Sequence, residues 1–330
     1  MDIRTLEQHF PELSFKQNES LAPYTFMKVG GEAEVFVEVK KREDLFALCA
    51  FCFQQKLAFR VLGGASNVLV PDAGLSGLAI RNLTDSIKIG EVVDGKCLVT
   101  VDSGATTAVV ANEAIKHNLT GLECFIGVPG TIGGAIVNNS HFSLKELIGD
   151  FVESVEVCTI DGKREVWGKD QLDFAYDYSV FHKRKDVVLS VTFTLEVGDP
   201  EEIQVGVRAA ALKRASTQPI GIPSSGCMYR NPQIDPTVFQ KLQAEIDIPQ
   251  GAYHDIENNR IQIAAGFLID RAGLKGKTVG GAQVSEKHAT YIINLGQATS
   301  SDVEALCLLV EATVKAKFAI TLEREVFFLS

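Results

Sequence analysis

The segment SSGCMYRNP at 224–232 holds the residue types best suited to chemistry in this chain. It places the thiol of Cys227 in a turn of small residues, close to a cation and to the amide of Asn231. A proton donor needs an accessible position on tight backbone, and an anionic substrate needs a donor that fixes its orientation. We therefore interpret Cys227 as an acid beside a substrate clamp. The alternative is a loop in which the cysteine has no chemical role.

Two glycine-rich segments, VLGGASNVLV at 61–70 and GVPGTIGGAIVNN at 127–139, could hold a phosphate-containing ligand. Glycine allows backbone N–H groups to approach a pyrophosphate closely, and Ser and Asn add side-chain donors. The first segment lacks the Lys-Ser/Thr ending of a P-loop and the GxGxxG pattern of a dinucleotide-binding unit, so alone it could equally be a tight turn. Together they favour a long cofactor with a diphosphate and a flat apolar ring. The candidate residues are Gly63, Gly64, Ala65, Ser66 and Asn67, then Pro129, Gly130, Thr131, Gly133, Gly134 and Ala135.

The elements that must position these residues follow from hydrophobic periodicity. Strand, helix and strand patterns at 35–39, 42–57 and 59–64 predict a small α/β unit. Short β-rich runs then extend to about residue 198, with one helix near 106–117. After Gly198-Asp199-Pro200 we expect helices over 201–214 and 301–317, a further helix in AAGFLIDRAG, and strands at ATYIINL and TLEREVFFL. This order predicts an α+β protein with more than one domain.

Composition narrows the class of protein. The 330 residues are 46% hydrophobic and 22% charged, which is enough to build two or three cores. The net charge of −10 argues against nucleic acid and acidic membrane surfaces as partners. No run approaches the roughly 18 apolar residues of a membrane span, and the opening MDIRTLEQHFPEL is unlike a signal peptide, so we expect a cytoplasmic protein.

The seven cysteines are scattered, which predicts reduced thiols and no disulfide framework. Cys49 and Cys52 stand three residues apart within an apolar helical pattern. With no second pair and no histidine to complete a zinc site, we interpret them as core thiols and expect no metal.

Five motifs in order resemble those of the UDP-N-acetylenolpyruvoylglucosamine reductase family, also called UDP-N-acetylmuramate dehydrogenases. They are VLGGASNVLV, GVPGTIGGAIVNN, RASTQPIGIPSSGCMYRNP, AAGFLIDRAGLKGKTVGGAQVSEKHA and LEREV, and the match extends from about residue 20 to 330. The resemblance implies a two-part FAD-binding domain of the vanillyl-alcohol-oxidase-like type and a C-terminal α+β substrate-binding domain. The implied boundaries are 1–80 with the returning strand 319–330, 81–200, and 201–318.

The resemblance also implies the reaction. NADPH reduces FAD, and the flavin reduces the enolpyruvyl ether of UDP-N-acetylglucosamine to UDP-N-acetylmuramate in peptidoglycan synthesis, which serves cell-wall formation, cell shape and division. Cys227 falls where the family carries a Ser or Cys proton donor, and Glu325 matches its C-terminal carboxylate. The implied contacts of the nucleotide-sugar are Asn231, Arg214, Lys275 and His288. Without the resemblance, Glu325 would be an ordinary exposed strand residue and His288 a surface or capping residue. The sequence carries no signal for the oligomeric state.

Two positions depart from the family pattern. The family has Tyr-Arg-x-Ser where this chain has Tyr176-Asp177-Tyr178-Ser179, so Asp177 replaces the Arg that binds the substrate carboxylate. The family also continues Asn-Ala-Gly-Ala where this chain places His141 and Phe142. Lys183 or Arg184 could supply the missing cation. The alternatives to a working reductase are a flavoprotein with another substrate, a catalytically impaired binder of flavin and nucleotide-sugar, and a binding module without flavin.

Overall fold

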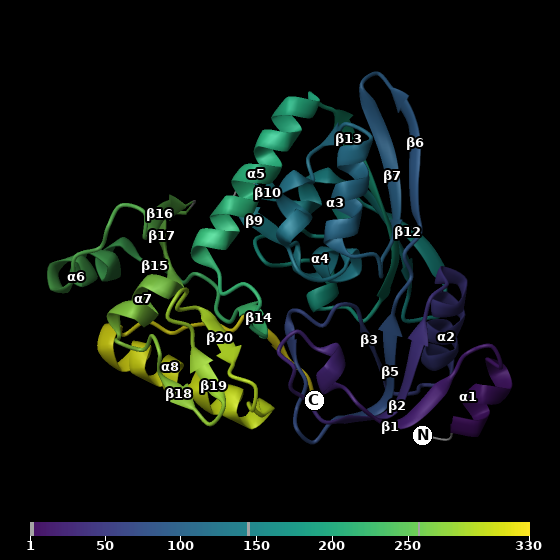
Figure 1. The fold of residues 1–330 in the computed structure, drawn as a ribbon, viewed down its shortest axis with the longest axis horizontal. Coiled ribbons are helices and arrows are strands. Elements are labelled where there is room, and N and C mark those ends of the chain that lie inside the picture. The colour runs from purple at the N-terminus through teal and green to yellow at the C-terminus, as the bar shows by residue number, and fades with distance from the viewer. Residues whose placement is uncertain (1–2, 144–145, 257) are drawn as a thin grey trace. The chain divides into compact units, whose positions relative to one another are not determined.

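The computed structural model describes residues 3–143, 146–256 and 258–330. The chain divides into two compact units, which are described separately (Figure 1). Unit 1 comprises Met1–Leu21, Glu32–Ala65 and Gly74–Ser216, and unit 2 comprises Ala22–Gly31, Ser66–Ala73 and Thr217–Ser330. The chain therefore enters and leaves each unit more than once.

The first sheet of unit 1 has the strand order β1-β2-β5-β3. β2 runs parallel to β5, and β5 runs parallel to β3, whereas β1 pairs antiparallel with β2. Helix α2 lies beside this sheet, and its apolar side shares a core with β2 and β5 (Figure 1). The bounds are α1 Ile3–His9, β1 Phe15–Ser20, β2 Glu32–Val39, α2 Arg42–Gln54, β3 Phe59–Leu62 and β5 Leu75–Asn82.

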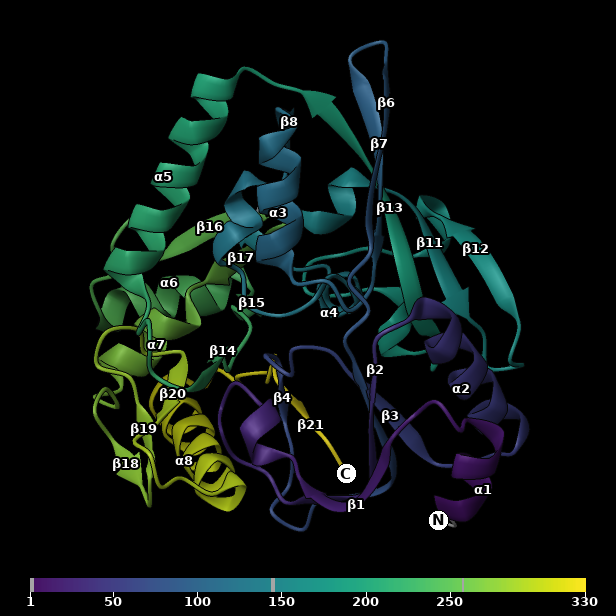
Figure 2. The same cartoon turned by 45° about the vertical axis from the view of Figure 1, so that its right-hand side comes forward.

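The second sheet of unit 1 is antiparallel, in the order β12-β11-β13-β7-β6, and β8 also pairs with β13. Helices α3 and α4 pack beside β7 and β13 (Figure 2). The strands are β6 Ile87–Val93, β7 Lys96–Asp102, β8 Leu119–Thr120, β11 Val152–Cys158, β12 Arg164–Gly168 and β13 Val187–Val197, and β9 His141–Ser143 pairs antiparallel with β10 Glu146–Leu147. The helices are α3 Thr107–Lys116, α4 Ile132–Asn138 and α5 Pro200–Thr217, with 3₁₀ turns at Glu123–Gly127, Ile148–Phe151, Lys169–Gln171 and Val180–His182.

Unit 2 combines the C-terminal part of the chain with two early segments. Its sheets have the orders β14-β20-β19-β18 and β15-β17-β16, and β21 pairs with β4 in parallel. The strands are β4 Val68–Leu69, β14 Ser224–Cys227, β15 Gln233–Ile234, β16 Tyr253–Ile256, β17 Arg260–Ile263, β18 Thr278–Val279, β19 Ala282–Val284, β20 Tyr291–Asn294 and β21 Phe327–Phe328. The helices are α6 Pro236–Glu245, α7 Ala265–Arg271 and α8 Ser300–Phe318, with a 3₁₀ turn at Ala22–Tyr24.

The long helix α8 begins with two sets of capping bonds. Thr299 Oγ1 accepts from Asp302 N at 3.0 Å, and Asp302 Oδ2 accepts from Thr299 N at 3.0 Å, which is a capping box. Asp72, from the early segment of unit 2, accepts from Ser300 N at 2.8 Å and from Ser301 N at 2.9 Å. Burial raises the pKa of the Asp72 carboxyl, but hydrogen bonds from Ser301 and Ser300 outweigh this effect and lower the pKa overall.

Replacing Asp72 with alanine is expected to lower the free energy of unfolding by about 1–2 kcal/mol, because two N–H groups at the start of α8 lose their acceptor. A lowered pKa means that the charged carboxylate stabilises the folded state above its unfolded pKa of about 3.9, and that this stabilisation is lost as the pH falls further. Urea unfolding should therefore show a difference from the unmodified chain that shrinks below about pH 4. Asp255→Ala, at an exposed position of β16, is the matched control. Equal midpoints for the two variants would contradict the capping role.

The structure confirms most of the elements predicted from periodicity. The helices expected over 42–57, 106–117, 201–214 and 301–317 are α2, α3, α5 and α8. Cys49 and Cys52 lie fully buried on α2, which confirms that they are core thiols. The C-terminal run TLEREVFFL differs, because only Phe327–Phe328 forms a strand.

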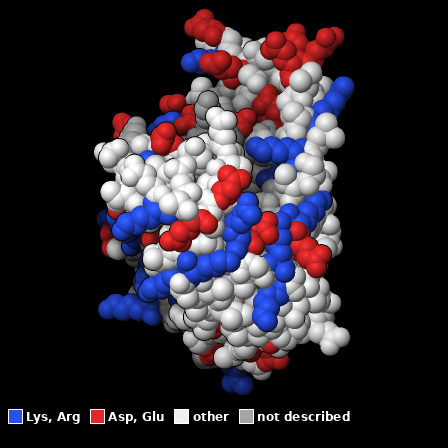
Figure 3. Space-filling model, turned by 90° about the vertical axis from the view of Figure 1, so that its left-hand side faces the viewer, with Lys and Arg blue, Asp and Glu red and all other residues white. Residues whose placement is uncertain are grey.

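Charges of both signs share the surface. On the face drawn in Figure 3, Lys and Arg side chains are interspersed with Asp and Glu side chains. An anionic ligand on that face would therefore depend on individual cations. Within the part of the chain that the structure describes, no helix is long and apolar enough to cross a membrane.

Candidate active site

Cys227 lies at the end of β14 and differs from the other cysteines in exposure. Its side chain is partly exposed, whereas the other six thiols are buried. Burial raises the pKa of four of these, Cys52, Cys124, Cys158 and Cys307, to about 12. A reactive thiol must be accessible and able to ionise, so Cys227 is the cysteine best placed for chemistry.

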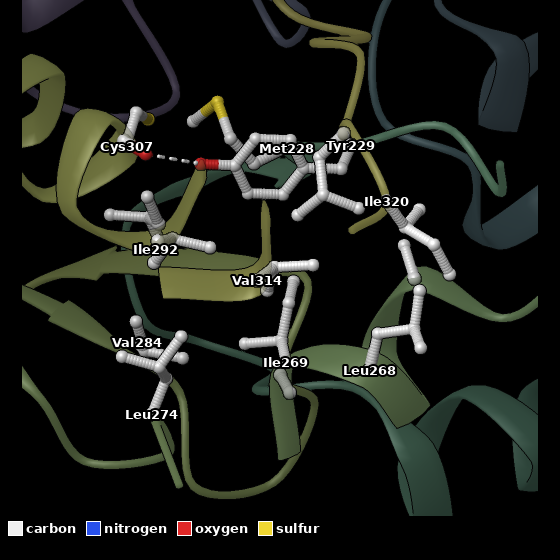
Figure 4. Packing of buried hydrophobic residues seen from close by; sticks show 14 of the residues in the cluster. Met228, Tyr229, Leu268, Ile269, Leu274, Val284, Ile292, Cys307, Val314 and Ile320 are labelled. Atoms are coloured by element: carbon white, nitrogen blue, oxygen red, sulfur yellow. Dashed lines mark hydrogen bonds between the residues drawn. The ribbon is translucent and has the colours of Figure 1, made fainter. Parts of the chain in front are cut away.

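The backbone around Cys227 is fixed on both sides. Met228 N donates to Thr290 O at 2.8 Å, and Glu325 N donates to Met228 O at 2.9 Å. The side chains of Met228 and Tyr229 are buried in the core of unit 2, and the Tyr229 hydroxyl donates to Cys307 O at 3.1 Å (Figure 4). These contacts bring the chain at Glu325 beside the residue that follows Cys227. The two predicted catalytic residues therefore stand on neighbouring segments of one unit.

Thr290 and His288 complete the surroundings of Cys227. Thr290 is buried, and its hydroxyl donates to Cys227 Sγ at 3.2 Å. The same hydroxyl oxygen lies 2.8 Å from His288 Nδ1. Burial, and secondarily the charge of Lys275, lower the pKa of His288, which favours the neutral imidazole at neutral pH.

Asn231 and Lys275, predicted to contact substrate, also lie in unit 2. Asn231 Oδ1 accepts from Ala265 N at 3.0 Å, at the start of α7. A ligand contact from Asn231 would therefore use its Nδ2 group. Lys275 Nζ lies 2.9 Å from Asp270 Oδ2, so a phosphate bound by Lys275 would compete with this ion pair.

The two glycine-rich loops approach one another at backbone level within unit 1. A Cβ on Gly64 would lie 2.9 Å from Gly130 Cα, and a Cβ on Gly63 would clash with Thr131 Oγ1. Ile132 N donates to Ala105 O at 2.8 Å, which fixes the second loop against the start of α3. Only glycine allows this approach, so the two loops pack against one another at backbone level.

The remaining predicted residues of these loops divide between the units. Ala65 belongs to unit 1, as do Pro129, Gly133, Gly134 and Ala135, whereas Ser66 and Asn67 belong to unit 2. Asn67 O accepts from Phe327 N at 3.1 Å, and Asn67 Nδ2 donates to Glu325 O at 3.4 Å. The 63–67 segment thus continues directly into the unit that carries Glu325.

His141 and Asp177, which the sequence analysis interprets as departures from the family pattern, are in contact with one another. His141 Nδ1 lies 3.0 Å from Asp177 Oδ1, and the side chain of Asp177 is 4% exposed. Ser179 Oγ donates to Val137 O at 2.6 Å, and Asn139 Nδ2 donates to Ala175 O at 2.9 Å. These bonds hold the segment at 137–141 beside the segment at 175–179.

The two basic residues considered as replacements for the family Arg have partners of their own. Arg184 Nε donates to Asp186 Oδ2 at 2.7 Å. Lys183 Nζ lies 5.3 Å from the centre of the Tyr178 ring. His141 contacts Asp177, and the sequence pattern gave His141 no such role.

Arg214, predicted to bind substrate, belongs to unit 1. It lies on α5, and its guanidinium carbon is 5.8 Å from the centre of the Phe142 ring. Lys213 Nζ lies 4.7 Å from the same ring. The structure thus brings two cations to Phe142, which follows His141 on β9, and it brings Cys227, Glu325 and His288 together in unit 2. The sequence analysis missed Thr290, because a threonine in SEKHAT carries no signal of its own.

Comparisons with known proteins match both the N-terminal and the C-terminal part of the chain. A family model described as "FAD binding domain" matches residues 33–167, and one described as "UDP-N-acetylenolpyruvoylglucosamine reductase, C-terminal domain" matches residues 218–329. The UDP-N-acetylenolpyruvoylglucosamine reductase of Listeria welshimeri is 33% identical over 98% of both chains. The reductase of Caldanaerobacter subterraneus is 34% identical over 98% of this chain and 96% of its own.

A solved structure is also similar over nearly the whole chain. The crystal structure of UDP-N-acetylenolpyruvylglucosamine reductase from Thermus caldophilus aligns with a TM-score of 0.72 and 29% identity. The alignment covers 96% of this chain and 99% of that one. The resemblance noted in five sequence motifs therefore extends to the complete fold.

Proposed function

The chain belongs to the UDP-N-acetylenolpyruvoylglucosamine reductase family of FAD-dependent oxidoreductases, and from this membership we propose its reaction. It reduces UDP-N-acetylglucosamine enolpyruvate to UDP-N-acetylmuramate in the cytoplasm, with NADPH as the hydride donor. The observation that carries the proposal is the partly exposed Cys227 on fixed backbone, with the chain at Glu325 hydrogen-bonded to the adjacent Met228. This arrangement provides an acid and a carboxylate for the protonation of a substrate carbon.

Cys227 gives the proton of its thiol to the carbon next to the one that receives hydride. The S–H bond breaks, the new C–H bond forms, and the electron pair stays on sulfur. A thiol suits this role because its ordinary pKa of about 8.5 is far nearer to neutrality than that of an aliphatic hydroxyl. Glu325, which matches the C-terminal carboxylate of the family, would assist this protonation. The thiolate then regains its proton from water.

FAD, when bound, would supply the transfer of a hydride equivalent from NADPH to the substrate. The residues that would hold its pyrophosphate are the backbone groups of the two glycine-rich loops. The support for this assignment is the close backbone approach of Gly64 to Gly130. The proposal includes all the residues predicted in both loops. They are Gly63, Gly64, Ala65, Ser66 and Asn67, and Pro129, Gly130, Thr131, Gly133, Gly134 and Ala135.

The nucleotide-sugar would be bound by cationic side chains, by an amide and by a histidine. Asn231 would use its Nδ2 group, since Oδ1 is engaged at the start of α7. Arg214 and Lys275 are suited to the diphosphate or the carboxylate. Thr290 contacts both Cys227 and His288, which supports a place for His288 near the reacting end of the substrate.

Purified protein tests the proposal directly. It should be yellow from bound FAD and should oxidise NADPH only when the enolpyruvyl nucleotide is added. Mass spectrometry should identify UDP-N-acetylmuramate as the product. A yellow protein that oxidises no NADPH with this substrate would refute the proposed reaction and leave flavin binding intact.

The contact between His141 and Asp177 favours a second candidate, a flavoprotein of this family that acts on another substrate or that binds without catalysis. Asp177 occupies the place of the carboxylate-binding Arg, and it contacts His141, which is itself a departure. Because these two departures contact one another, we infer that together they change one side of the active site. Restoration of growth in a strain that lacks the reductase would exclude this candidate.

Replacing Asp177 alone with arginine is expected to lower the free energy of unfolding by on the order of 3 kcal/mol. It removes a partner of His141 and places a guanidinium at a nearly buried position with φ of 49°. The double variant His141→Gly/Asp177→Arg should recover part of this loss, and its kcat should exceed that of Asp177→Arg. Urea unfolding and steady-state kinetics measure the two effects, with His141→Gly as the control. Strictly additive effects would show that the two residues are not coupled.

A further inference from the structure

The hydroxyl of Thr290 lies between Cys227 Sγ, at 3.2 Å, and His288 Nδ1, at 2.8 Å. A thiolate has no proton and can only accept, so toward the thiolate of Cys227 the Thr290 hydroxyl gives its single proton to sulfur. The contact between Thr290 Oγ1 and His288 is then made with Nδ1–H as the donor. In the thiolate state both donors therefore point toward the sulfur.

The backbone holds these side chains in register. Cys227 pairs with Tyr291 across β14 and β20, and Tyr291 N donates to His288 O at 2.9 Å. Ser285 Oγ accepts from His288 N at 3.3 Å, which closes the turn before Thr290. Thr290 itself is 3% exposed, so water cannot readily replace its hydroxyl.

The groups that face His288 leave its imidazole neutral. The Tyr291 ring lies 5.0 Å away between ring centres, and α7 approaches the ring with the backbone of Gly266. Burial of the ring, and secondarily the positive charge of Lys275, disfavour a positive charge on the imidazole. A neutral ring with Nδ1–H can donate to Thr290 over a wide range of pH.

We propose that Thr290 and His288 are positioning residues that stabilise the thiolate of Cys227 through this directed pair of hydrogen bonds. The inference rests on the proposed function, in which Cys227 protonates a substrate carbon. When the S–H bond breaks, the negative charge on sulfur receives the Thr290 O–H donor, which His288 Nδ1–H polarises in turn. A charged acceptor strengthens both bonds, so the chain of donors makes Cys227 a stronger acid than an isolated thiol.

The test measures the thiol itself and needs neither flavin turnover nor substrate. The rate at which iodoacetamide alkylates Cys227 is followed against pH in the full chain, with the labelled peptide identified by mass spectrometry and Cys227→Ala as the blank. Thr290→Val removes the hydroxyl and keeps the shape of the side chain. It is expected to move the pH midpoint of alkylation up by about one unit, since hydrogen bonds to charged groups have that magnitude.

Matched variants separate this role from a purely structural one. Thr290→Ser keeps the hydroxyl and should return the midpoint toward that of the unmodified chain. His288→Ala, at a half-buried position, should give a smaller upward shift. The pH dependence of kcat should move in the same direction in Thr290→Val, while KM for the nucleotide-sugar changes little.

The outcomes are distinct. Unchanged alkylation midpoints in both Thr290→Val and His288→Ala would overturn the inference, whatever the activity of the enzyme. If the midpoints shift as expected and Cys227→Ala still turns over at the full rate, the assignment of Cys227 as the acid fails instead.

Discussion

Replacing Cys227 with alanine is expected to slow reduction of the enolpyruvyl substrate by about 10²–10⁴-fold, the usual contribution of a positioned general acid. The bleaching of flavin absorbance by NADPH should be unchanged, because that half-reaction transfers no proton to the substrate carbon. Stopped-flow absorbance separates the two steps, with NADPH alone in the first and the nucleotide-sugar added in the second. The defect should appear only in the second.

Cys227→Ser is the informative comparison, since it keeps an ionisable proton in the same place. Its hydroxyl is a weaker acid, so we expect activity between that of the alanine variant and that of the unmodified chain. The Thr290 donor should still reach the serine oxygen, because the backbone of β14 and β20 sets the spacing. Equal activities for Cys227→Ala and the unmodified chain would show that another group donates the proton.

Replacing Gly64 with alanine is expected to weaken FAD binding by about tenfold to a hundredfold. The added Cβ would lie 2.9 Å from Gly130 Cα, and backbone on both sides cannot yield as a flexible side chain can. Overpacking of this kind costs about 1–3 kcal/mol, and 1.4 kcal/mol corresponds to a factor of ten. The ratio of absorbance at the flavin band to protein absorbance reports the loss after purification, and titration with FAD measures the affinity.

Gly168→Ala serves as the control for this variant. Gly168 is exposed in unit 1 and has an ordinary φ of −73°. A Cβ added there would meet no heavy atom of the described residues within 4 Å. The variant should retain FAD and unfold like the unmodified chain. Retention of FAD by Gly64→Ala with unchanged affinity would show that the close packing of Gly64 against Gly130 is not needed to hold the cofactor.

The sequence predicted which segments form helices better than it predicted which strands pair with one another. Helices α2, α3 and α8 follow from continuous periodicity, and α8 also has a local start signal in the capping box of Thr299 and Asp302. The residues that form each of these patterns are close together in the sequence, so each helix can be recognised from a single stretch. The pairing of β4 with β21 has no local signal, and it could not be inferred from periodicity.

The same distinction applies to the site. Cys227 stood out because a thiol in a small-residue turn is unusual, and Glu325 was identified only through the family resemblance. Thr290 is brought to Cys227 by strand pairing across 63 positions of sequence. His141 and Asp177 were recognised separately as departures, and their contact depends on how the segments around Asn139 and Ala175 fold together. Side-chain contacts of this kind can be identified only from the tertiary structure.

The pairing of β4 with β21 has a consequence for how the protein is made on the ribosome. Asn67 and Glu325, which flank this pairing and are hydrogen-bonded, are 258 residues apart. At roughly 5–20 residues per second, the first partner waits on the order of 10–50 s for the second. During that interval unit 1 can begin to fold while residues 66–73 remain without their strand partner. A translation arrest before residue 327 would therefore yield a chain in which residues 66–73, which continue the first glycine-rich loop, lack their strand partner.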